Sequence, residues 1–324
     1  MILRTEGLTK IFTVSPRRRV TAVRDLSLTI DEGEIFGFVG PNGAGKTTTI
    51  KMLMGLIFPT RGRAFIFDAP IPSSVSKAGI GYLPEHPAYH EFLTGAEAMR
   101  FFAKLSGVPR RDRDDRCGEL LELVGLAGAA DRSIRKYSKG MQQRLGIAQA
   151  LVGDPAFVVL DEPMSGLDPI GRKEMRDLIL ELKRRGKTVF FSTHILPDVE
   201  TLCDRVGIIL NGALRDVGRL GDLLSPRVRG VEMTAIVPEG AREAIACARV
   251  LSRGGDVFTL AFQDELAAEA ALRAVLASGG RLVQLTPHRE TLEDFFLRRL
   301  ESEAGAPGGA APRADDDLRQ RVAS

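Results

Sequence analysis

Cysteine is scarce in this sequence, with three residues among 324. Cys117, Cys203 and Cys247 are odd in number and far apart, and the sequence has no Cys-x-x-Cys pair. A disulfide framework or a zinc ribbon needs paired and regularly spaced cysteines, so both classes are excluded. We expect reduced thiols with structural or surface roles.

Long apolar runs and a strong excess of one charge are also missing. No segment approaches the roughly 18 apolar residues that a membrane-spanning helix requires, and residues 1–5 lack the features of a signal peptide. The formal net charge is only +3 although 27% of the residues are charged, so we expect no nucleic-acid partner. With 44% hydrophobic residues the chain can form a full α/β core with about a hundred residues beyond it. We therefore expect a cytoplasmic protein with more than one domain.

Glycine is concentrated in one segment, Gly-Pro-Asn-Gly-Ala-Gly-Lys-Thr-Thr at residues 40–48. An apolar run at 35–39 precedes it, and apolar residues at helical spacing follow it: Ile50, Leu53, Met54 and Ile57. The pattern predicts a strand, a glycine loop and a helix, the arrangement that cradles phosphate groups. The residues that would lie against the phosphates are Gly40, Asn42, Gly43, Ala44, Gly45, Lys46, Thr47 and Thr48.

Each residue type in this loop has a physical role in a phosphate site. Gly43 and Gly45 allow backbone N–H groups to approach phosphate oxygens, and the helix N-terminus adds partial positive charge. Lys46 can reach the β- and γ-phosphates, and the Thr47 hydroxyl can bind Mg²⁺. Taken alone, the pattern is also compatible with an ordinary glycine-rich turn beside a surface lysine.

Two later apolar runs end in polar residues suited to phosphoryl transfer. Residues 156–160 read as a buried strand followed by Asp161 and Glu162, at the strand end where open α/β sheets bind ligands. We predict that Asp161 binds Mg²⁺ and that Glu162 is the base that orients the attacking water. The next run, 188–191, leads to His194, which can donate a hydrogen bond to the γ-phosphate. Alone, an Asp-Glu pair is more often a solvated strand end, and a lone histidine is more often a surface residue.

A fourth motif, Tyr-Ser-Lys-Gly-Met-Gln at 137–142, begins a helical pattern with Ser138 as its N-cap. The order of glycine loop, this helix start, Asp-Glu strand end, Ser-Gly-Leu-Asp turn and histidine resembles the ATPase subunit of an ATP-binding cassette (ABC) transporter. The resemblance covers about residues 2–220. It implies an α/β P-loop ATPase core with an antiparallel β subdomain and an inserted helical subdomain at about 86–153.

The same resemblance implies ATP and Mg²⁺ as cofactors and a head-to-tail dimer of two ATPase subunits around two ATP molecules. Lys46, Glu162 and His194 would then be catalytic. The nucleotide would also be contacted by Ser138, Gly140 and Asp168. An integral-membrane permease would be the further partner.

Two departures from the family pattern concern these motifs. The usual helix start is Leu-Ser-Gly-Gly-Gln, whereas this chain has Lys139 for the first glycine and Met141 for the glutamine. The loop that carries a glutamine toward the metal resembles Gly81-Tyr-Leu-Pro-Glu85, so we place Glu85 with Thr47 and Asp161 at the metal. Together, Tyr-Leu-Pro-Glu and Tyr-Ser-Lys-Gly-Met resemble the branch that serves type-2 ABC exporters.

Near the N-terminus, Phe12 lies where the family has an aromatic residue that stacks on adenine. An apolar residue of a first strand is also compatible with a simple core position. We expect the arginines at 17–19 in a solvated loop before a strand from Val20 to Ile30.

The rest of the chain predicts further elements. Thr94 and Glu97 form a capping-box pattern, and Asn211-Gly212 is a hairpin signal that closes a first domain at 1–220. A small α/β domain is expected at 221–300, from strands at 231–237, 258–262 and 281–285 and helices at 266–277 and 291–297. Gly, Ala, Pro and charged residues dominate 301–324, which predicts a disordered tail.

We interpret the chain as a Mg²⁺-dependent ATPase that dimerises on ATP and drives a separately encoded permease, an exporter, at the cytoplasmic face of the cell membrane. One alternative is an ABC ATPase that acts on ribosomes or DNA, but such relatives carry two cassettes or a long coiled coil, and this chain has neither. Another is a P-loop kinase or GTPase, which would leave Ser138 and His194 unexplained.

Overall fold

The computed structural model describes residues 1–224 and 228–304. The chain divides into two compact units, Met1–Leu220 and a second that begins at Gly221, and each is described by itself. No helix among these described residues is long and apolar enough to cross a membrane.

The centre of the first unit is a six-stranded sheet in the order β10-β9-β3-β8-β7-β6, whose strands are parallel except for the hairpin partner β10. The strands are β3 (Ile35–Val39), β6 (Ile80–Leu83), β7 (Phe157–Asp161), β8 (Thr188–Thr193), β9 (Arg205–Leu210) and β10 (Ala213–Arg219). Every residue of β3, β7 and β8 is buried, as in parallel strands covered on both faces, and most of their residues are apolar. The helices that follow β3, β7 and β8 are α1 (Lys46–Leu53), α6 (Pro169–Arg184) and α7 (Leu196–Leu202).

The predicted helix after the glycine loop is present, but it is shorter than expected. It ends at Leu53, so Ile57 lies outside it, contrary to the prediction from its spacing. Gly55 has a φ of 66°, a left-handed conformation that commonly terminates helices and that glycine adopts without steric cost.

An antiparallel sheet in the order β2-β1-β4-β5 packs beside this core. Its strands are β1 (Leu3–Ser15), β2 (Arg18–Ile30), β4 (Arg61–Ile66) and β5 (Ala69–Pro70). One hydrophobic cluster joins residues of this sheet, such as Leu8, to Met52 of α1 and Phe190 of β8. The prediction of an arginine loop at 17–19 was wrong for Arg18 and Arg19, because β2 already begins at Arg18 and pairs with Ser15.

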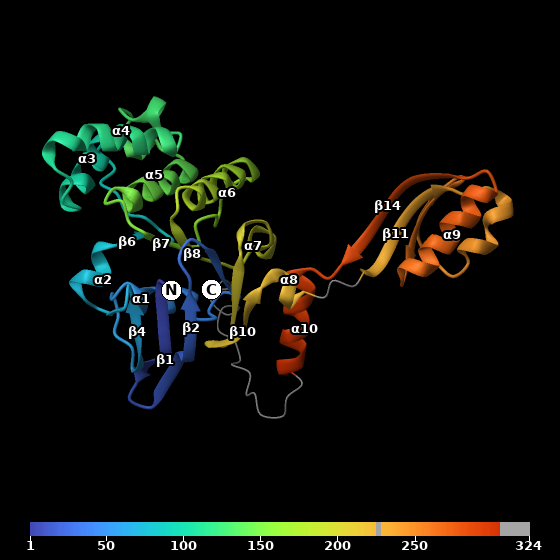
Figure 1. Ribbon diagram of the computed structural model, residues 1–324, viewed down its shortest axis with the longest axis horizontal. Helices are drawn as coiled ribbons and strands as arrows, with labels where there is room; N and C mark the ends of the chain where they lie inside the picture. Colours follow the sequence, from blue (N-terminus) through green and yellow to red (C-terminus); the bar gives the residue numbers. More distant parts are fainter. Residues whose placement is uncertain (225–227, 305–324) are drawn as a thin grey trace, which may run out of the picture. The chain divides into compact units, whose positions relative to one another are not determined.

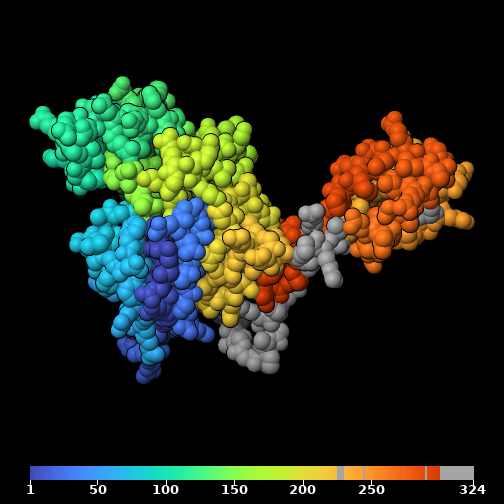
Figure 2. Space-filling view, in the orientation of Figure 1, coloured from blue at the N-terminus to red at the C-terminus, as the bar shows by residue number. Residues whose placement is uncertain are grey.

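Three helices between β6 and β7 form the predicted helical insertion: α3 (Gly95–Leu105), α4 (Arg113–Leu123) and α5 (Lys139–Leu151). Figure 1 shows them, in green, gathered apart from the antiparallel sheet, and Figure 2 shows the same residues as a lobe of the first unit. The capping box of Thr94 and Glu97 is formed in both directions. The short helix α2 (Ser74–Ala78) lies before β6.

The second unit contains a four-stranded antiparallel sheet in the order β12-β13-β11-β14 with one helix against it. Its elements are β11 (Val228–Ile236), β12 (Arg249–Gly254), β13 (Val257–Phe262), α9 (Glu265–Ala277) and β14 (Arg281–Arg289), followed by α10 (Leu292–Ala304). The helix α8 (Leu220–Leu223) lies at the junction between the units. The apolar residues that alternate along β11 and β13 pack with α9 into a separate core.

Two expectations for this second unit need correction. The edge strand β12 was not predicted, because all its residues are exposed and it has no buried alternation. Residues 301–304 belong to α10 and not to a tail, since the helix continues past the predicted end of the domain. The remainder of the expected tail, 305–324, lies outside the described residues.

Candidate nucleotide-binding site

The glycine loop lies between the end of β3 and the start of α1, in the conformation that a phosphate cradle requires. Gly43 and Gly45 have φ values of 80° and 105°, which other residues rarely adopt. A β-carbon on Gly45 would lie 2.4 Å from the carbonyl oxygen of Ala22, and one on Gly40 would lie 2.3 Å from that of Ile209. The loop is therefore pressed against β2 and β9, and only glycine fits at both places.

The loop borders a cavity of about 340 Å³. Helix α1 begins at Lys46 without a side-chain cap, so the N–H groups of its first turn remain available to an anion. The cavity is lined by Ala22, Asn42, Gly43, Gly45, Lys46, Thr47, Thr48, Glu85 and Glu162. These residues fit a nucleoside triphosphate, because backbone N–H groups and a lysine that can bind phosphate oxygens line the same cavity as two carboxylates.

Lys46 is only 5% exposed, and its ammonium group has three polar neighbours. It donates to the carbonyl oxygens of Gly40 at 2.7 Å and Pro41 at 3.2 Å. Its Nζ also lies 3.1 Å from Oε1 of Glu162. The structure thus brings together the predicted phosphate-binding lysine and the predicted base.

Asp161, the last residue of β7, is buried next to Thr47. The Thr47 hydroxyl donates to Asp161 Oδ1 at 3.3 Å, and the Ser192 hydroxyl donates to the same oxygen at 2.7 Å. Burial raises the pKa of Asp161 above its usual value, and the hydrogen bonds from Ser192 and Thr47 oppose that rise. The charges of Glu85 and Glu162 raise it further.

The predicted metal ligands are compatible with Mg²⁺. The described residues contain no group of three or more His, Cys, Asp and Glu side chains that could hold a metal ion. Mg²⁺ usually takes one or two carboxylates together with phosphate oxygens and water. The adjacent oxygens of Thr47 and Asp161 suit this role, and Glu85 lines the same cavity as Thr47.

Glu162 directly follows β7 and has a φ of 50°, a left-handed conformation unusual for a residue other than glycine. The turn that it makes is held by Ser165, whose N–H donates to its carbonyl oxygen at 3.1 Å. His194 Nδ1 lies 2.9 Å from Glu162 Oε2. A carboxylate oxygen accepts, so Nδ1–H donates to it, and Nε2 is the ring nitrogen left for another partner.

Ser192 is a residue of the site to which the sequence prediction gave no role. It is fully buried in β8, and it accepts the N–H of Glu162 at 3.0 Å while it donates to Asp161. In the parallel pairing of β7 with β8, Asp161 lies opposite Ser192. The sequence offered one signal for Ser192, its position two residues before His194. Its contact with Asp161 could be identified only from the register in which β7 pairs with β8.

The loop that carries Glu85 is attached to the helical insertion. The side chain of buried Gln143, on α5, donates to the carbonyl oxygen of Glu85 at 3.0 Å.

Burial and the charges of Asp161 and Glu85 together raise the pKa of Tyr82 to about 12, so its phenol stays neutral. The Tyr82 hydroxyl near Asp161 and Glu85 is therefore uncharged.

The remaining predicted residues do not line this cavity. Ser138 caps α5 by accepting the N–H of Met141 at 3.2 Å, and Asp168 caps α6 by accepting that of Gly171 at 2.8 Å. Gly140 follows Ser138 in the first turn of α5. Phe12 lies on β1, 39% exposed, with the Lys10 ammonium 5.1 Å from the centre of its ring.

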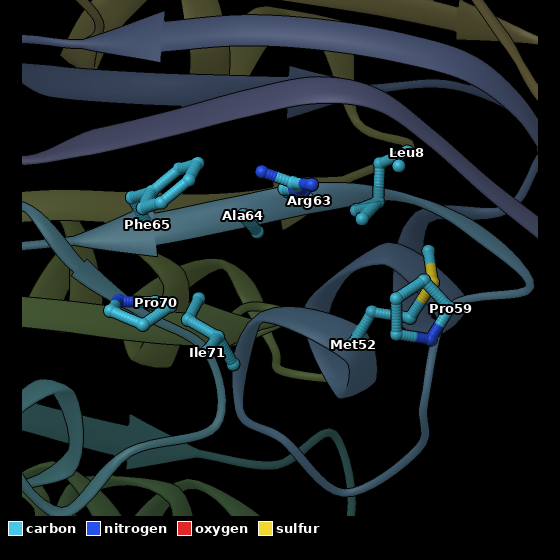
Figure 3. A pocket seen from close by; sticks show the side chains of 9 residues that line it. Leu8, Met52, Pro59, Arg63, Ala64, Phe65, Pro70 and Ile71 are labelled. Atoms are coloured by element: carbon cyan, nitrogen blue, oxygen red, sulfur yellow. The ribbon is translucent and has the colours of Figure 1, made fainter.

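A second cavity, of about 420 Å³, lies between β1, the end of α1 and β4. Figure 3 shows its lining, which is mostly apolar apart from Arg63: Leu8, Met52, Pro59, Ala64, Phe65, Pro70 and Ile71. It contains none of the predicted site residues, so the glycine-loop cavity remains the candidate site.

Comparison with known proteins agrees with this geometry. Residues 23–165 match the family model described as ABC transporter. An uncharacterized ABC transporter ATP-binding protein of Synechocystis sp. is 40% identical over 92% of this chain and 84% of its own length. A fluoroquinolones export ATP-binding protein of Mycobacterium tuberculosis is 41% identical over 66% of this chain and 69% of its own length. A solved ATP-binding subunit of an ABC transporter is 31% identical, with a TM-score of 0.61 over 69% of this chain and 92% of that structure.

Proposed function

Because the chain belongs to the ATP-binding proteins of ABC transporters, we propose that it hydrolyses ATP in a Mg²⁺-dependent reaction and powers an exporter. The observation that carries the proposal is the joining of Lys46, Glu162 and His194 by contacts of 3.1 and 2.9 Å beside the glycine loop. The similarity to an export protein supports the direction of transport.

Glu162 is the proton acceptor in this proposal. Its carboxylate lines the cavity, and His194 donates to one of its oxygens, which fixes the carboxylate's orientation. The other oxygen is the one near Lys46. A positioned base of this kind contributes about 10²- to 10⁴-fold to a rate.

Phosphate binding is assigned to the glycine loop and metal binding to its neighbours. The N–H groups at 43–48 and the ammonium of Lys46 stabilise the negative charge of the phosphates. Thr47 and Asp161 would hold Mg²⁺, together with Glu85, which lines the same cavity as Thr47 and takes the place of the family's glutamine. The metal ion, when bound, neutralises charge that develops on the phosphate oxygens.

We further propose that two ATPase subunits, identical in the simplest case, close on ATP. Ser138 and Gly140 lie outside the cavity of their own chain, at the N-terminus of α5, which suits an anion supplied by another subunit. Asp168 also lies outside that cavity, and because its carboxylate already caps α6, its contact with the nucleotide is assigned from the family resemblance. Phe12, exposed on β1, is assigned to the adenine. In this proposal 1–220 is the cassette, 221–300 an accessory domain, and the dimer works on a separately encoded permease at the cytoplasmic face of the membrane.

The test is Glu162→Gln, which keeps the shape of the side chain but removes its basicity. ATP binding should be retained, and steady-state turnover should fall by about 10²- to 10⁴-fold. Glu181→Gln is the matched control, because it makes the same change on the surface of α6 and should leave turnover unaltered. Retention of most wild-type activity by Glu162→Gln would rule out the assignment of the base.

A further inference from the structure

Helices α6 and α7 pack against each other, and an ion pair joins them, with its carboxylate buried and its guanidinium partly exposed. Arg176 of α6 donates to Asp198 Oδ1 of α7 at 3.1 Å, and the Asp198 side chain is only 3% exposed. The second carboxylate oxygen of Asp198 has no hydrogen-bond partner among the described residues. Removal of the cation beside a buried carboxylate lowers the stability of the protein, because it leaves a buried charge without compensation.

The two helices that this pair connects both begin next to the site. Glu162 directly follows β7, and the turn after it leads through the cap residue Asp168 into α6. His194 follows β8 and leads directly into α7. The ion pair therefore links the helix that follows the base Glu162 to the helix that follows His194, and these two residues also contact each other.

The first turn of α7 has no side-chain cap at its N-cap position. Ile195, at its N-cap position, provides no side-chain cap, and Pro197 in the first turn has no N–H to bond. Val199 of α7 and the C-cap residue Cys203 pack against β3, where a β-carbon on Gly37 would lie 2.6 Å from Cys203 Sγ and 3.2 Å from Val199 Cγ1. Contact with β3 holds the helix against the sheet, and the contact with Arg176 sets its position relative to α6.

We propose that Arg176 and Asp198 form a positioning pair that sets the relative placement of Glu162 and His194, and that hydrolysis depends on it. Neither residue lines the glycine-loop cavity, so the pair acts through the two helices. The inference rests on the proposed function, because it assumes that Glu162 and His194 take part in hydrolysis.

The main test is Asp198→Asn, which keeps the size of the side chain and removes its charge. We expect kcat at saturating Mg-ATP to fall about tenfold, equivalent to about 1.4 kcal/mol of barrier. KM should change by less than about twofold, because the glycine loop lies on β3 and α1 and not on the helices that the pair joins. Arg176→Lys, which retains a cation, should keep more of the activity than Asp198→Asn. Glu181→Gln, which breaks the exposed pair with Arg185 on the same helix, should change neither parameter.

A double variant separates positioning from stability. Arg176→Met with Asp198→Leu replaces the ion pair by apolar side chains, a change that often restores or improves stability at buried pairs. The proposal expects the melting temperature to recover while kcat stays low, since apolar contact does not fix one geometry. Recovery of kcat together with the melting temperature, or a kcat within about twofold of wild type in folded Asp198→Asn, would overturn it.

The proposed function is judged by a different comparison. If the wild-type protein hydrolyses ATP, Glu162→Gln does not, and the Arg176 and Asp198 variants behave as wild type, only the positioning role fails. If the wild-type protein does not hydrolyse ATP, the proposed function fails and the positioning role fails with it.

Discussion

The hydroxyl of Ser192 offers a sharp test of how the site is held together, through the change Ser192→Ala. This hydroxyl is fully buried and makes two hydrogen bonds: it donates to Asp161 at 2.7 Å and accepts from the N–H of Glu162 at 3.0 Å. A hydrogen bond to a charged group contributes about 1.5–3 kcal/mol, and a buried N–H left without an acceptor costs about 1–3 kcal/mol. Because both groups belong to one network and their effects are not additive, we expect a loss of about 2–4 kcal/mol.

Thermal unfolding followed by circular dichroism measures this loss. For a unit of this size each kcal/mol shifts the melting temperature by about 2–4 °C, so a fall of roughly 5–15 °C is expected. Ser27→Ala is the matched control, because Ser27 is exposed and accepts only one hydrogen bond, from the N–H of Gly7. Its effect should stay within about 0.5 kcal/mol.

The same substitution should change the pH dependence of activity. Burial raises the pKa of Asp161, and the hydrogen bond from Ser192 lowers it, so removing that bond moves the pKa upward. Since the ionised carboxylate is the form that binds a metal ion, the acid limb of the rate profile should move to higher pH in Ser192→Ala. A variant with the melting temperature and the acid limb of the wild type would refute the reasoning.

Two further predictions concern assembly and acid stability. Sedimentation of Glu162→Gln should show a monomer-to-dimer shift on addition of Mg-ATP. Ser138→Arg should weaken this shift, and Ser138→Asn should weaken it less because it keeps a cap for α5. Absence of any ATP dependence would contradict the dimer proposal. A hydrogen bond from Lys187 holds the pKa of Asp154 below its usual value, so this group contributes stability above its unfolded pKa that is lost as the pH falls through the folded value. Asp154→Asn suits the left-handed φ of 54° and should cost less than about 1 kcal/mol at pH 7, because the side chain is largely exposed. In acid titration it should reduce the loss of stability that begins at the unfolded pKa, about 4, and continues below it. An unchanged acid transition would count against this pair.

The elements that could be predicted from sequence are those whose signals are local. The glycine loop between a buried strand and a helix was found because Gly43 and Gly45 occupy conformations that other residues avoid. The Asn211-Gly212 hairpin has the same basis, since both residues have positive φ between β9 and β10. The helix caps at Thr94 and Ser138 depend on hydrogen bonds three residues along the chain, so the sequence alone was sufficient.

The elements that could not be predicted depend on contacts far apart in the chain. The edge strand β12 has a register shift in its pairing with β13, and all its residues are exposed, so its sequence carries no periodic apolar signal. The order of the parallel strands places Asp161 opposite Ser192 and Glu162 beside His194, and no local pattern specifies that order.

Arg176 and Asp198 are a second example of residues whose contact could not be predicted from local sequence. In the sequence each is one charged residue among several on an amphipathic helix, where a solvated position is the usual outcome. It is the packing of α6 on α7 that buries Asp198 and places it against Arg176. Residues that contact a ligand are constrained by chemistry that recurs in many proteins, so their types can be recognised in order along the chain. Residues that position them are constrained by the local packing of one fold, so their identification needed the structure.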